Sequence, residues 1–314
     1  MATTETDKKL RGRLKIAAAI TALIFILELA GGYLTNSLAL LSDSAHVLMD
    51  VLALSISWFA HYISSKPPTA KRTFGLHRFE VFASLINGLS LLIISLFIFY
   101  KAYGRVLDPP EVESVGLLII AVIGLLVNLF VAFFLRGFAK GDLNVKSAYF
   151  HVLGDAAASV GVIIGAIIIY YTGWNLADPF ISVLIAAIIL GGAINIVRES
   201  THILLEGTPS EIDLNEVADD IKSMDCILGV HSLHIWSLCF NIYALSAHIE
   251  VDLNPAKCGG NKDILDKVNE ILAQKHHIFY TTLQAECTGC DLKDLLRNVE
   301  HHNDDASCHL NHGH

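Results

Sequence analysis

Six apolar stretches, each about 20 residues or longer, fill most of the first two thirds of the chain. A transmembrane helix needs about 20 apolar residues to cross the hydrocarbon core of a bilayer. Only 17% of the 314 residues are charged and the mean hydropathy is +0.53, whereas about a quarter of a soluble domain is charged. The sequence therefore predicts an α-helical membrane protein with six transmembrane helices, near residues 14–34, 39–63, 79–103, 114–136, 145–171 and 178–198.

Basic residues indicate the orientation of these helices. They gather before the first span, after the last, and in the second-to-third and fourth-to-fifth connections, at Lys8, Lys9, Arg11, Arg13, Lys15, Lys66, Lys71, Arg72, Arg78, Arg136, Lys140, Lys146 and Arg198. The other connections contain only Arg105, with Lys101 near the membrane edge. Because cytoplasmic loops carry an excess of Lys and Arg, both termini are predicted to be cytoplasmic.

A smaller domain of soluble character follows Pro209. Its pattern predicts two amphipathic helices and three strands in the order α-β-β-α-β, at residues 211–224, 230–238, 243–252, 261–276 and 279–287. This order predicts a cytoplasmic ferredoxin-like α+β domain. The expected organisation is an N-terminal cytoplasmic segment 1–13, a transmembrane domain 14–206, an α+β domain 207–296 and a disordered His-rich tail 297–314.

A His and an Asp four residues apart occur twice inside the predicted spans, as His46 and Asp50 in the second and as His151 and Asp155 in the fifth. Residues at i and i+4 lie on one face of a helix, about 6 Å apart. Polar groups at membrane depth are energetically costly, so they normally face a partner, a cavity or an ion. A single pair would often serve only to hydrogen-bond a neighbouring helix, but two pairs favour one shared site.

Two imidazoles and two carboxylates from facing helices form a ligand set suited to tetrahedral Zn²⁺. Imidazole in place of carboxylate favours Zn²⁺, Co²⁺ and Cd²⁺ over Mn²⁺ or Mg²⁺. An imidazole binds metal only when it is neutral, and the ordinary pKa of histidine is about 6.5, so protons compete with metal for such a site. A site that faced each side of the membrane in turn could exchange Zn²⁺ for protons.

The two His–Asp pairs and four further stretches resemble the cation diffusion facilitator family, in its zinc-transporting branch. These stretches are Ser37–Asp43, Thr73–Glu80, Leu204–Pro209 and His231–Trp236. The resemblance runs in family order from about residue 14 to about residue 290. It implies a homodimeric antiporter in the lipid bilayer that exports Zn²⁺ from the cytoplasm in exchange for protons. The short chain without a long His-rich loop favours a prokaryotic inner membrane.

The resemblance also implies a regulatory zinc site in the α+β domain, at His231, His248 and Glu286, with His234 as a further candidate. The alternative is that these histidines are ordinary, half-exposed strand residues. Cys287 and Cys290 form a C-x-x-C pair, which is half of a common zinc-binding pattern. A redox role is the alternative for this pair, because residues 291–297 could form the helix that follows such a motif.

Two more residues are candidates near the membrane domain. The resemblance implies a metal at His77, between the membrane and cytoplasmic parts, and the alternative is an interfacial hydrogen bond. Asp43 lies three residues before His46 on the same helix face. Its expected role is to orient the metal ligands or to admit the ion to the site, and a water-facing residue at the helix end is an equally favoured alternative.

Two other functions compete with transport. One is a membrane-embedded zinc enzyme, but four protein ligands would leave the metal no open position for a reacting water. The other is a metal sensor with residues 207–314 as its output. Those residues resemble no catalytic or nucleic-acid-binding module, so transport is the preferred interpretation and no nucleic-acid partner is expected.

Overall fold

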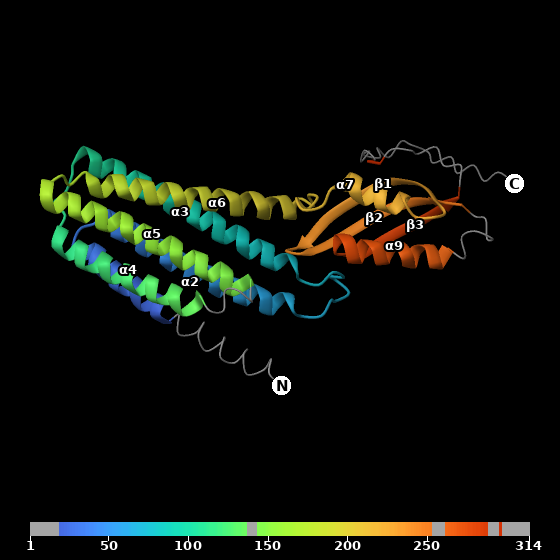
Figure 1. Ribbon diagram of the computed structural model, residues 1–314, viewed down its shortest axis with the longest axis horizontal. Coiled ribbons are helices and arrows are strands. Elements are labelled where there is room, and N and C mark those ends of the chain that lie inside the picture. Colours follow the sequence, from blue (N-terminus) through green and yellow to red (C-terminus); the bar gives the residue numbers. More distant parts are fainter. Residues whose placement is uncertain (1–18, 137–142, 253–260, 288–294, 297–314) are drawn as a thin grey trace, which may run out of the picture. The chain divides into compact units, whose positions relative to one another are not determined.

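The computed structural model describes residues 19–136, 143–252, 261–287 and 295–296, which fall into two compact units divided between Thr201 and His202 (Figure 1). Each unit is considered by itself. The predicted N-terminal segment 1–13 and the His-rich tail 297–314 lie outside the described residues, and the predicted domain boundaries stay predictions.

The first unit is helical. Its long helices within the described residues are α2 (Leu38–Ser64), α3 (Arg78–Leu107), α4 (Ser114–Arg136), α5 (Leu143–Thr172) and α6 (Ala177–Leu204). All five contain segments long and apolar enough to cross a membrane. A shorter apolar helix, Ala19–Leu34, matches the first predicted span, whose expected start at residue 14 lies outside the described residues. The predicted helical membrane architecture is confirmed.

These helices lie side by side with nearly parallel axes (Figure 1). Buried side chains of α2, α5 and α6, including Leu40, Ala166 and Ile189, belong to one apolar cluster. Large apolar side chains such as Phe133 and Ile188 are exposed on the outer faces. Exposed faces of this kind are expected where helices contact lipid tails, which are as apolar as leucine.

The second unit has the predicted α-β-β-α-β order. It consists of α7 (Leu214–Lys222), β1 (Ile227–Cys239), β2 (Ile242–Val251), α9 (Asn261–His276) and β3 (Ile278–Cys287). The sheet order is β1-β2-β3, with β2 antiparallel to β1 and parallel to β3. Both helices bury apolar residues such as Ile221 and Leu272 against the same sheet face, where Leu233 and Ile249 complete the core.

An acid on α7 ties the two helices of this unit together. Asp220 accepts hydrogen bonds from Lys275 Nζ at 2.8 Å and from His276 Nε2 at 2.6 Å, both in the last turn of α9. These hydrogen bonds, that from Lys275 first, hold the pKa of the Asp220 carboxyl below its usual range. A carboxyl whose pKa is lower in the folded state stabilises that state above the unfolded pKa, and the contribution is lost as pH falls.

We therefore expect Asp220→Asn to lower the urea midpoint of this unit at pH 7, with the difference from wild type shrinking below the ordinary carboxyl pKa of 3.8. Trp236 fluorescence would report unfolding in full-length protein in which Trp58 and Trp174 are replaced by Phe. Glu216→Gln is the matched control, because the exposed side chain of Glu216 pairs with the exposed Lys275, at 3.2 Å, so the substitution should have less effect. An equal deficit of Asp220→Asn at pH 7 and pH 3 would contradict the expectation.

Candidate metal centres

Three of the four predicted membrane ligands lie together where α2 contacts α5. His46 Nε2 is 3.7 Å from Asp50 Oδ2 on the next turn of α2, and 4.0 Å from Asp155 Oδ1 on α5. One ligand atom of each residue lies within 4.8 Å of the others. Ligands of a tetrahedral Zn²⁺ at about 2.0 Å stand roughly 3.3 Å from one another, so small side-chain adjustments would complete a shared site.

The fourth predicted ligand is His151, which lies on α5 one turn before Asp155. Its side chain lies outside the part of the structure that is described. Because α5 is helical through both residues, the backbone places His151 and Asp155 on the same face. The structure thus brings together His46, Asp50 and Asp155, and His151 stays a prediction.

Two fully buried acids accompany this cluster. Asp43 lies on α2 one turn before His46, and Glu28 belongs to the helix Ala19–Leu34; each is 1% exposed. Glu28 Oε2 and Asp43 Oδ1 have no hydrogen bond within the described residues. Glu28 reaches α4 where Gly124 leaves room, since a Cβ there would lie 2.9 Å from its Oε1. So many carboxylates in an apolar surrounding favour a bound cation.

The second group of candidate ligands comes from three neighbouring strands. His231 on β1 pairs with His248 on β2, and Glu286 lies on β3. Glu286 contacts both histidines, with Oε2 at 3.1 Å from His231 Nε2 and Oε1 at 2.7 Å from His248 Nδ1. The three predicted regulatory ligands therefore come together. They would leave a fourth position of a tetrahedral metal open.

In a regular strand, His231 and Leu233 would lie on the same face of the sheet. A bulge in β1 explains why they lie on opposite faces. The register skips one residue between His231 and His234, and Ser232 has a φ of 50°. The extra residue turns Leu233 into the apolar core while His231 stays on the other face, 2% exposed. His234 pairs with Ser246, is exposed, and does not belong to the group of three.

The other predicted metal residues do not join these groups in the described part of the chain. Cys287 pairs with Val251, a core residue, so it lies on the sheet face opposite Glu286. Cys290 lies outside the described residues. His77 is half-buried just before α3 and belongs to neither of the two groups found among the described residues.

This chain is similar to known membrane transport proteins over most of its length. Residues 14–205 match the model of the cation efflux transmembrane domain, and residues 209–287 match that of the cation efflux protein cytoplasmic domain. The chain is 42% identical over 263 residues to a cadmium, cobalt and zinc/H⁺-K⁺ antiporter of Bacillus subtilis, covering 83% of this chain and 84% of that protein.

Two further relatives have similar coverage. The metal cation efflux system protein CzcD of Cupriavidus metallidurans is 40% identical over 91% of this chain and 89% of its own length. The zinc transporter ZitB of Pectobacterium atrosepticum is 36% identical over 92% of this chain and 90% of its own length. With both family models matched in order along the sequence, this chain belongs to the cation efflux, or cation diffusion facilitator, family of membrane metal transporters, in its zinc, cobalt and cadmium branch.

Proposed function

We propose that this protein exports Zn²⁺ from the cytoplasm across a bacterial inner membrane, in exchange for protons. The observation that carries the proposal is the meeting of His46, Asp50 and Asp155, from two membrane helices, within 4.8 Å of one another. The names of the relatives, which include zinc, cadmium and cobalt transporters and an H⁺-coupled antiporter, support the same substrates here. Co²⁺ and Cd²⁺ are therefore further substrates.

The donor set explains the choice of metal. With His151, the site would offer two imidazole nitrogens and two carboxylate oxygens, a tetrahedral set for a borderline-soft ion. His46 and Asp50 are about a quarter exposed, whereas the side chain of Asp155 is 9% exposed. The α2 ligands are thus the more accessible part of the cluster, and the carboxylate of α5 is its buried part.

Exchange against protons follows from the same ligands. Metal binding requires a neutral imidazole and ionised carboxylates, so each proton that arrives weakens the hold on the metal. If the site opens alternately to the two sides, the more acidic side receives Zn²⁺ and returns protons. Both termini would lie in the cytoplasm, as the distribution of basic residues predicts.

We expect Asp155→Asn in full-length protein to lower Zn²⁺ flux into proteoliposomes by about tenfold or more, because the metal loses a charged ligand. A zinc indicator and a pH indicator inside the vesicles would measure both ions. Asp108→Asn is the matched control, since Asp108 is exposed just after α3 and lies outside the cluster.

Retention of wild-type flux by Asp155→Asn would refute the transport site. Zinc flux by the wild type that left the internal pH unchanged would refute proton exchange while leaving export intact.

We further propose that the protein is a homodimer and that zinc at His231, His248 and Glu286 regulates transport. The shared carboxylate of Glu286 supports this role, because one metal could replace its two contacts with histidine by three metal bonds. Binding there would favour one conformational state of the dimer and so change the transport rate.

We expect His248→Ala to abolish activation of transport by cytoplasmic-side Zn²⁺ while flux at low zinc persists. His248 is the better target because its side chain is 29% exposed and that of His231 only 3%, so the substitution disturbs packing less. His234→Ala, on an exposed neighbouring position, should leave activation unchanged. Flux measured over a range of free zinc tests this, and normal activation in His248→Ala would disprove the regulatory site.

A further inference from the structure

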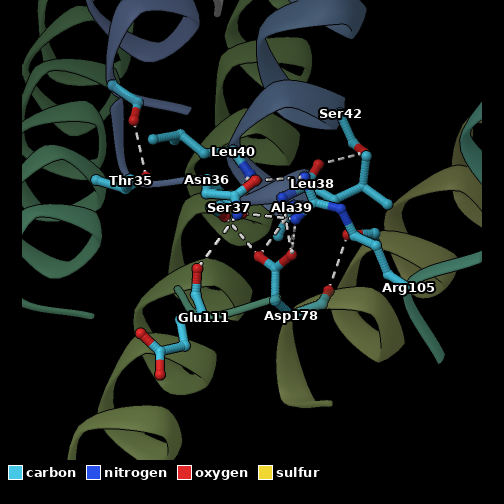
Figure 2. Close-up of polar contacts among 12 residues, drawn as sticks. Thr35, Asn36, Ser37, Leu38, Ala39, Leu40, Ser42, Arg105, Glu111 and Asp178 are labelled. Atoms are coloured by element: carbon cyan, nitrogen blue, oxygen red, sulfur yellow. Dashed lines mark hydrogen bonds and ion pairs between the residues drawn. The ribbon is translucent and has the colours of Figure 1, made fainter. Parts of the chain in front are cut away.

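A carboxylate from another helix caps the N-terminus of α2 (Figure 2). Asp178, in the first turn of α6, accepts a hydrogen bond from Leu38 N at 2.7 Å and another from Ala39 N at 3.2 Å. It also accepts one from Ser37 Oγ at 2.5 Å. The first N–H groups of a helix have no acceptor inside the helix. This carboxylate, which is 1% exposed, is their acceptor.

A cation from a third helix completes this arrangement. Arg105, in the last turn of α3, donates to Asp178 Oδ2 at 3.3 Å and to Asn36 O at 2.6 Å. Asn36 has a φ of 54°, and its side chain accepts from Arg105 at 3.0 Å and donates to Glu111 O at 3.2 Å. Figure 2 shows these groups converging on the turn that leads into α2.

The same end of α6 also contacts α5. A Cβ on Gly165 of α5 would lie 2.2 Å from Ile181 Cδ1, three residues beyond Asp178 on α6. The side chain of Ile181 thus packs into the space that Gly165 leaves on α5. Thus α6 contacts both helices that carry the proposed transport ligands, α5 through Gly165 and α2 through Asp178.

The position of α2 along its axis determines where its proposed ligands, His46 and Asp50, lie. At 1.5 Å per residue, His46 lies about 12 Å and Asp50 about 18 Å from Leu38 along a continuous helix. A slip or rotation at the capped end would therefore carry both residues away from Asp155. We propose that Asp178 is a positioning residue for the transport site. It holds α2 at the axial position where His46 and Asp50 meet Asp155 of α5. This inference rests on the proposed function.

The test is transport of Zn²⁺ and Cd²⁺ by full-length Asp178→Asn in proteoliposomes. Asn keeps the size of the side chain but loses the charge and one acceptor oxygen. Misplaced ligands should raise the KM for Zn²⁺ by about tenfold or more and change the ratio of Zn²⁺ to Cd²⁺ transport, with a smaller fall in maximal rate. Asp108→Asn should match the wild type in all three quantities.

A residue that serves folding alone would lower the amount of active protein and the maximal rate, but neither the KM nor the metal ratio. That result in folded Asp178→Asn would overturn the proposal. If Asp178→Asn does not fold, Ser37→Ala decides. It removes the hydrogen bond that Ser37 Oγ donates to Asp178 and the one that it accepts from Leu40 N, and it leaves the carboxylate paired with Arg105. It should raise the KM by about fivefold or more, the equivalent of two hydrogen bonds, and an unchanged KM would overturn the proposal.

Asp155→Asn separates this inference from the proposed function. If Asp155→Asn transports normally, the transport site itself is wrong. If Asp155→Asn is inactive and Asp178→Asn has wild-type KM and metal ratio, only the positioning role fails.

Discussion

The arrangement of the membrane unit depends on how its buried charges are neutralised in an apolar surrounding. A carboxylate at membrane depth is tolerated only when a cation, a set of N–H groups or a metal neutralises it. Asp178 is neutralised by Arg105 and by the N–H groups at the start of α2. Asp50 and Asp155 gather around His46, beside the buried Asp43 and Glu28, and this excess of acids is what suits the cluster to a divalent ion.

The two candidate metal centres reflect two ways of bringing ligands together. In the membrane unit, the helix repeat puts His46 and Asp50 on one face, and helix packing adds Asp155. In the second unit, strand pairing sets His231 opposite His248, and the parallel strand adds Glu286. The first arrangement can change when helices move, whereas the second is fixed by the sheet.

Local periodicity explains what could be predicted from the sequence. The i, i+4 spacing of His46 and Asp50 and the alternation of β2 depend only on backbone geometry, and both were predicted. The bulge at Ser232, between His231 and His234, breaks that alternation and has no local signal. The Asp178 cap joins residues 140 positions apart, so no pattern within one helix reveals it.

The contacts of Glu286 with the two histidines would affect how readily the second unit binds a metal ion. Its two oxygens already bridge His231 and His248, so the donor atoms stand near their bound positions before any metal arrives. Little ordering entropy then opposes occupancy, and the entering ion competes mainly with the existing contacts to this one carboxylate. The strength of those contacts would thus set the concentration at which the domain fills, and a weaker acceptor at this position would shift that threshold without reshaping the sheet.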